Sequence, residues 1–81
     1  MRVDKFLKVS RIIKRRTVAN EACSGERVRV NGREAKPSYN VKIGDVIELD
    51  LGSRQLKVQV QSVPEHAAKA DAELMYKEIR E

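Results

Sequence analysis

The side chains of this sequence that are best suited to chemistry are cations near the N-terminus. Residues 1–16 carry seven of the chain's 17 lysines and arginines against one acid, Asp4, and so hold a net charge of +6. The remaining residues net −1, so the +5 of the whole chain is concentrated in this segment. Such a concentration predicts a surface that binds a polyanion through its phosphate groups.

Side chains that could act as nucleophiles, general bases or metal ligands are few. Cys23 is the chain's one cysteine, so neither an internal disulfide nor a cysteine-based metal site is expected. Cys23 would be a nucleophile only beside a base, and its place on an apolar helix favours a small buried side chain. His66 has only Glu65 near it and is expected at an exposed helix start. Glycines occur singly, without a phosphate-cradling loop. We therefore expect no catalytic residue, no metal site and no cofactor.

A helix over residues 3–13 is expected to position the first cations. At 100° per residue its inner stripe consists of Val3, Phe6, Leu7, Ser10 and Ile13. The opposite side carries Lys5, Lys8, Arg11 and Arg15, with Arg2 at the margin. Acids that usually alternate with lysines on a solvated helix face are missing, which favours phosphate binding over a merely solvated face.

A second helix should follow the basic triplet Lys14-Arg15-Arg16. Thr17 is the expected N-cap of a helix over residues 18–24, with Val18, Ala19, Ala22 and Cys23 turned inward. Gly25 is expected to end it in a left-handed conformation. The triplet would then lie at the corner between two helices, where helix amides and cations together favour an anion.

Beyond Gly25 the hydrophobic period changes to that of strands. Val28 and Val30 precede Asn31-Gly32, the signature of a type I′ hairpin turn, and residues 33–36 are the expected return strand. Pro37 ends that strand, and Gly44-Asp45 turns into a strand over residues 46–51. A last strand is expected over residues 56–61. The pattern predicts an α+β fold in which two short N-terminal helices pack on a small twisted antiparallel sheet.

The C-terminal part of the chain is expected to form a third helix. Residues 65–80 offer Ala67, Ala70, Leu74, Met75 and Ile79 as a thin apolar stripe, so this helix is expected to pack loosely on the sheet or to project. We divide the chain into a domain at residues 1–64 and a C-terminal helix at 65–81. No segment is apolar enough for a membrane span or a signal peptide, and with one cysteine this predicts a cytoplasmic protein.

Four blocks in order resemble the S4 RNA-binding domain, also called the αL motif. They are Arg2-Val3-Asp4-Lys5-Phe6-Leu7, the corner Arg15-Arg16-Thr17-Val18-Ala19, the stretch from Gly25 to Gly32, and Val41-Lys42-Ile43-Gly44-Asp45. Together the four blocks extend through more than half of the chain. A single Asn-Gly or Gly-Asp would carry no weight, whereas the order and spacing of all four are specific.

Within that superfamily the sequence from Arg2 to Thr17 and the Met75-Tyr76 pair are similar to the RqcP family, also known as YabO-like proteins. The resemblance implies a factor of bacterial ribosome-associated quality control. Such proteins bind large ribosomal subunits that still hold a peptidyl-tRNA, contacting rRNA and tRNA. They support the partner RqcH, which adds alanine tails to the stalled chain. We expect the same partners here, and a protein that acts as a monomer.

Two alternatives stay open. The heat-shock S4 proteins also bind obstructed large subunits, but they usually have a longer and more basic C-terminal extension than the mixed Lys77-Glu78-Ile79-Arg80-Glu81 of this chain. The second alternative is a general RNA-binding module that recognises structured RNA. S4 domains also accompany pseudouridine synthases and tyrosyl-tRNA synthetases, but 81 residues leave no room for a catalytic domain, so we expect no enzyme.

The expected RNA-binding residues follow from these placements. Arg2 can make a bidentate phosphate contact beside the helix start, and Arg16 matches the arginine that the family has at this corner. Tyr39 is the one candidate for base stacking, although a half-buried loop tyrosine is the commoner reading. Recognition should rest on phosphates and shape. The full set is Arg2, Lys5, Lys8, Arg11, Lys14, Arg15 and Arg16, with Arg29, Arg33 and Lys36 as further candidates that are equally well explained as solvated strand residues.

Overall fold

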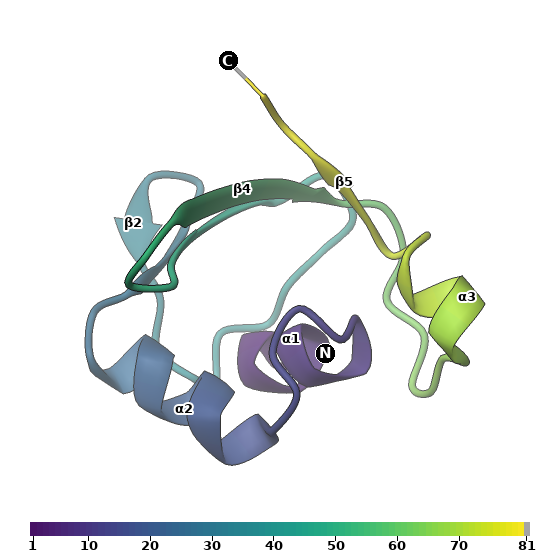
Figure 1. Ribbon diagram of the computed structural model, residues 1–81, viewed down its shortest axis with the longest axis horizontal. Coiled ribbons are helices and arrows are strands. Elements are labelled where there is room, and N and C mark those ends of the chain that lie inside the picture. Colours follow the sequence, from purple (N-terminus) through teal and green to yellow (C-terminus); the bar gives the residue numbers. More distant parts are fainter. Residues whose placement is uncertain (81) are drawn as a thin grey trace.

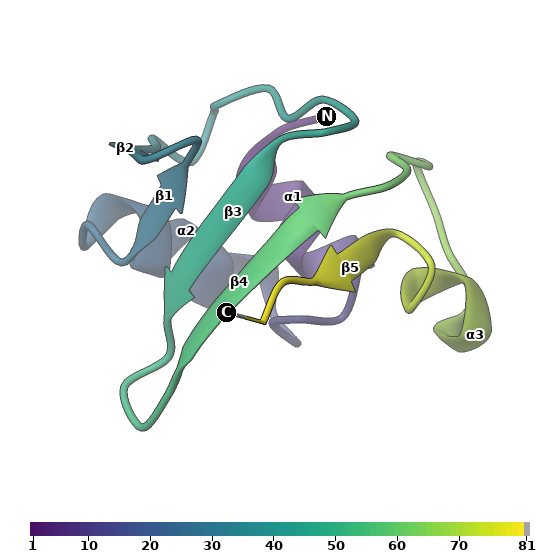
Figure 2. The same ribbon diagram turned by 90° about the horizontal axis from the view of Figure 1, so that it is seen from above.

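The computed structural model describes residues 1–80, and within them the chain forms three helices and one five-stranded antiparallel sheet (Figures 1 and 2). The strand order is β2-β1-β3-β4-β5. Figure 1 shows the sheet as one layer, with α1 and α2 packed against one of its faces. This arrangement confirms the predicted α+β fold of two N-terminal helices on a small antiparallel sheet.

Helix α1 spans Val3–Val9 and turns its apolar stripe inward as predicted. Val3, Phe6 and Leu7 are fully buried, and Ser10 and Ile13 beyond the helix are buried as well. The expected helical end at residue 13 is wrong, because the helix stops four residues earlier. Arg11 adopts a left-handed φ of 63°, and the Ile13 amide donates to the Leu7 carbonyl at 3.0 Å. That turn returns Ile13 to the core, where it is buried.

Helix α2 spans Arg16–Ser24, so Thr17 lies inside it and is not its cap. The N-cap is Arg15, in an extended conformation and without a side-chain cap hydrogen bond. Val18 points outward, with 46% of its surface exposed, which corrects the expectation that it turns inward. The inner face is made by small side chains, which let α2 approach α1 closely, namely Ala19, Ala22 and Cys23.

Gly25 ends α2 for a reason other than the predicted one. Its φ is −86°, and the left-handed residue is Glu26 at 63°. A Cβ on Gly25 would lie 3.1 Å from the Glu21 carbonyl oxygen, tighter than ordinary packing. The glycine is therefore favoured by the closeness of the preceding helical turn rather than by backbone handedness.

The hairpin that follows is confirmed. β1 spans Val28–Val30 and β2 spans Arg33–Glu34, shorter than the four residues expected for the return strand. Asn31 and Gly32 both have positive φ, 54° and 81°, as a type I′ turn requires. Val28 and Val30 are buried under the helices, and so Arg29 between them faces the other side of the sheet.

The crossover after Pro37 runs beside the start of α1. The Val3 amide donates to the Tyr39 carbonyl at 2.7 Å, and the Val41 amide donates to the Met1 carbonyl at 2.8 Å. Asp45 organises the turn that follows, since its carboxylate accepts hydrogen bonds from the Lys42 amide and from the side chains of Asn31 and Tyr39. The first residues of α1 are thereby fixed against residues far along the chain.

β3 spans Val46–Asp50 and β4 spans Gln55–Val60, paired in the register Ile47 to Val58. The alternation predicted from sequence is confirmed, because Ile47, Leu49, Leu56, Val58 and Val60 are buried. Leu51, expected as the last residue of β3, lies outside the strand and is 36% exposed, because the chain already turns there towards Gly52.

The long C-terminal helix expected over residues 65–80 is wrong in extent. Only Lys69–Ala72 is helical, as α3, and Tyr76–Glu78 forms strand β5. β5 pairs with β4, with Tyr76 opposite Val60, and so gives hydrogen-bond partners to a strand edge that a loosely packed helix would leave open. Met75 is fully buried, whereas Leu74 is 71% exposed, so the stripe was also assigned wrongly at Leu74. The prediction for residue 81 lies outside the described residues.

Candidate nucleic-acid interface

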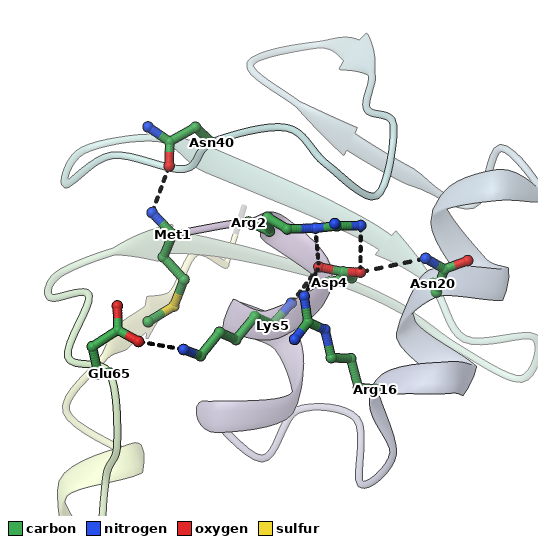
Figure 3. Close-up of polar contacts among 8 residues, drawn as sticks. All are labelled: Met1, Arg2, Asp4, Lys5, Arg16, Asn20, Asn40 and Glu65. Carbon is green, nitrogen blue, oxygen red and sulfur yellow. Dashed lines mark hydrogen bonds and ion pairs between the residues drawn. The ribbon is translucent and has the colours of Figure 1, made fainter.

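Asp4 is the centre of a polar cluster at the junction of α1 and α2, drawn in Figure 3. The guanidinium of Arg2 donates to both carboxylate oxygens at 3.2 Å. Arg16 donates to Oδ1 and Asn20 to Oδ2, each at 3.4 Å, and the Lys5 amide donates to Oδ1 at 2.7 Å. We call Arg2, Asp4, Arg16 and Asn20 the Asp4 corner.

The electrostatics of this cluster keep Asp4 ionised although its surface is almost entirely buried. Burial by itself raises the pKa of the carboxyl group. The hydrogen bond from Asn20, the Lys5 amide and the charges of Arg16 and Arg2 outweigh it and hold the pKa of Asp4 below its usual 3.8. A buried carboxylate thus anchors two arginines that come from different parts of the chain.

Arg2 and Arg16 keep much of their binding capacity in this arrangement. Their side chains are 49% and 46% exposed, and each guanidinium has five N–H donors, of which Asp4 accepts two from Arg2 and one from Arg16. Both arginines line a shallow groove together with Asp4, Thr17, Asn20 and Glu21. Two oriented guanidinium groups beside the start of a helix are well suited to phosphate oxygens.

The other predicted cations of residues 1–16 are exposed along the same part of the molecule. Lys8, Arg11, Lys14 and Arg15 are exposed. Lys5 is the exception, because it forms an ion pair with Glu65 and is only 29% exposed. The predicted single row on one helix is therefore not what the structure shows, because α1 ends at Val9 and Arg11, Lys14 and Arg15 follow it. Arg2, Arg16 and Lys5 are moreover paired with carboxylates.

The hairpin cations do not join this row. Arg29 lies opposite Glu34 and Glu48 in the strand register, on the sheet face that points away from the helices. Arg33 is exposed on β2, and Lys36 is exposed just beyond it. These three residues form a separate, more mixed surface.

The remaining candidates for chemistry have structural surroundings. Cys23 is buried, and its burial together with the nearby charge of Asp4 raises the pKa of the thiol to about 11. Such a thiol stays protonated and unreactive at neutral pH. His66 is exposed as expected, but it precedes α3 and does not lie at a helix start. Among residues 1–80, no group of three or more histidine, cysteine, aspartate or glutamate side chains could hold a metal ion.

Tyr39 is tethered rather than free. Its hydroxyl donates to the Asp45 carboxylate at 3.1 Å, and desolvation together with Asp45 raises the pKa of the phenol. Tyr39 is still 36% exposed in the crossover. Base stacking on Tyr39 stays a prediction.

The sequence alone did not identify Asp4 as the carboxylate that pairs with Arg2 and Arg16. One signal was available, because Asp4 is the only acid among seven cations in residues 1–16. It also missed Asn20 and Glu65, whose contacts depend on how α2 and the C-terminal segment pack beside α1.

None of the helices formed by residues 1–80 has the length and apolar character that a membrane span requires.

Comparison with known proteins matches residues 1–47 to the S4 domain. Over its whole length the chain is 48% identical to the RQC P-site tRNA stabilizing factor of Streptococcus pneumoniae, and covers 92% of that protein. It is 34% identical to heat shock protein 15 of Escherichia coli, of which it covers 62%. The trimeric structure of Vibrio cholerae heat shock protein 15 superposes with a TM-score of 0.91 at 31% identity, over 98% of this chain and 81% of that one.

Proposed function

This chain belongs to the S4 domain family, together with the RQC P-site tRNA stabilizing factors, and on that premise we propose that it acts in bacterial ribosome-associated quality control. It would bind the large ribosomal subunit that holds a stalled peptidyl-tRNA, without catalysing a reaction. In that state it would support alanine tailing of the nascent chain by RqcH. The protein would act in the cytoplasm as a monomer.

One observation carries the proposal. A chain of full-length similarity to a P-site tRNA stabilizing factor presents exposed cations on and just beyond α1, and two arginines paired with Asp4 where α1 meets α2. RNA duplexes are recognised largely through phosphates and 2′-hydroxyl groups, for which such a surface is suited. We assign RNA binding to Arg2, Lys5, Lys8, Arg11, Lys14, Arg15 and Arg16. Arg29, Arg33 and Lys36 would contact RNA only where a second segment reaches the hairpin.

The similarity to heat shock protein 15 supports a second candidate, a factor that recycles obstructed large subunits. An assay of alanine tailing distinguishes the two candidate functions. In cells that lack this protein, a stalled reporter should lose its RqcH-dependent alanine tails, and the wild-type gene should restore them. Tails that persist unchanged would favour the recycling factor.

Arg16→Ala tests the Asp4 corner as the anchor on the large subunit. We expect it to weaken co-sedimentation with large subunits by about 1.5 to 3 kcal/mol, the range of a charge-assisted contact. Arg16→Lys should restore binding only in part, because an ammonium group cannot reproduce the guanidinium fork. Arg54→Ala, which removes an exposed arginine in the β3–β4 turn, is the matched control. Equal binding by Arg16→Ala and Arg54→Ala would exclude the corner as the anchor.

Salt dependence tests the electrostatic part of the proposal. If about four to six phosphates are neutralised, log affinity plotted against log salt concentration should fall with a slope of about −3 to −5. Arg11→Ala should make that slope shallower by nearly one unit. Filter binding of purified large subunits over a salt series gives both values. A slope near zero would contradict phosphate recognition by this surface.

A further inference from the structure

A second cationic surface lies between the end of α1 and the segment that leads into α3. It is a groove, which we call the α1–α3 groove, lined by Lys8, Val9, Arg11, Lys14, His66, Ala67 and Lys69. Lysine, arginine and histidine supply all of its polar lining side chains, and no carboxylate is among them. Val9 and Ala67 are partly buried against the hydrophobic core and form its apolar part.

The C-terminal side of the groove is held in place by the core. Met75 is fully buried, and its carbonyl oxygen accepts hydrogen bonds from the amides of Gln61 and Ser62 at 2.7 and 3.2 Å. Ala72 of α3 is also fully buried. Figure 3 shows Lys5 reaching from α1 to Glu65, one residue before His66. His66 and Lys69 therefore face α1 on a fixed segment.

The α1–α3 groove is separate from the Asp4 corner. Figures 1 and 2 show α1 between α2 and α3, so the corner lies on the α2 flank and the groove on the α3 flank. The two sites also differ in charge balance. Arg2 and Arg16 share the Asp4 carboxylate, whereas none of the lysines and arginines of the groove makes an ion pair with any residue among 1–80.

The charge of the groove indicates what fills it. Unpaired cations held near one another repel, and an anion with repeated charges relieves that repulsion and releases its own counterions. The groove extends from Lys8 of α1 and from Arg11, which follows that helix, to the C-terminal segment. Of the carboxylates nearest in sequence to His66 and Lys69, Glu65 is paired with Lys5, and Asp71 does not line the groove.

We propose that the α1–α3 groove binds the sugar–phosphate backbone of RNA, with His66 and Lys69 as RNA-binding residues additional to the N-terminal cations. This inference rests on the proposed function, since the RNA is that of the large subunit or of the tRNA held on it. Lys69 contacts a phosphate across the groove from Arg11 and Lys14. The Asp4 corner and the α1–α3 groove then bind RNA on opposite flanks of α1.

Lys69→Glu tests the proposal, with Lys77→Glu as the matched control. Lys77 is an exposed lysine of β5, so the same charge is reversed on the same C-terminal segment outside the groove. We expect Lys69→Glu to weaken large-subunit binding about tenfold or more and Lys77→Glu to weaken it less than about threefold. His66→Ala should weaken it about two- to fivefold. Equal losses for Lys69→Glu and Lys77→Glu would overturn the proposal.

The same assay distinguishes the possible sources of the phosphates. Vacant large subunits and large subunits that carry peptidyl-tRNA are compared for each variant. A loss on both particles assigns the groove to rRNA, and a loss on the loaded particle alone assigns it to tRNA. If the wild-type protein binds neither particle, the proposed function fails. If it binds and only Arg16→Ala weakens binding, the groove proposal alone fails.

Cross-linking identifies the class of molecule in the groove. A photoreactive group is attached at Lys69→Cys in a Cys23→Ala background, which removes the buried native thiol. Adducts with RNA after irradiation on large subunits support the proposal. Adducts with ribosomal protein alone would overturn it, because the groove would then receive an acidic protein surface.

Discussion

Replacing Leu7 by alanine is expected to destabilise the fold by about 2 to 4 kcal/mol, through lost burial and the cavity that remains. Leu7 is fully buried in the core beneath the sheet. A domain of 81 residues has a total stability of roughly 4 to 12 kcal/mol, so this one substitution removes a large share of it. Thermal or urea denaturation followed by circular dichroism measures the loss.

Lys8→Ala is the control, because it changes the neighbouring residue on the opposite side of the same helix. Lys8 is exposed, so its loss should hardly change the melting temperature, while it should weaken co-sedimentation with large subunits. If Lys8→Ala unfolds the protein and Leu7→Ala does not, the helix faces have been assigned the wrong way round.

Asp4→Ala is expected to reduce both stability and RNA binding. Removal of the carboxylate leaves Asn20 and the Lys5 amide without their acceptor and frees the two arginines that it orients, at a cost of about 1 to 3 kcal/mol. Arg2 and Arg16 keep their charges, so any loss of affinity for large subunits reports lost orientation rather than lost charge. Affinity that rises in Asp4→Ala would show that the carboxylate only neutralises the arginines.

The same cluster predicts how stability responds to acid. Because the pKa of Asp4 in the folded state lies below 3.8, its contribution is fully present above about pH 5 and disappears as the pH falls through 3.8 towards the folded value. Asp4→Asn keeps the side-chain shape but removes this titration. We therefore expect the wild-type protein to lose its stability advantage over Asp4→Asn below about pH 4. Parallel unfolding curves for the two proteins down to pH 3 would contradict this.

The elements that sequence predicted well are those fixed by short-range patterns. In β3 and β4, buried residues alternate with polar ones, as at Ile47, Leu49, Val58 and Val60. This alternation is enough to predict the strands and the face that each one buries. Asn31-Gly32 specifies its turn through the positive φ of both residues. The buried stripe of α1 follows in the same way from helical spacing.

The elements that sequence predicted poorly depend on partners far along the chain. α1 ends where Arg11 can reverse the chain so that Ile13 reaches the core, and β5 forms because β4 offers it an edge. The candidate site, too, was predicted from sequence only in part. Charge and spacing predicted the cationic row, but the pairing of Arg16 with Asp4 needs the packing of α2 on α1. Local propensity contains no information about such contacts.

The shortness of the two outer strands bears on how the protein behaves at high concentration. β2 has two residues and β5 has three, so each side of the sheet offers few backbone groups to a strand of another molecule. Short outer strands are a known protection against edge-to-edge aggregation and amyloid growth. The longer strands β3 and β4 lie inside the sheet, between β1 and β5. Fibril formation would therefore first require β5 to detach and expose β4, a step opposed by the burial of Met75.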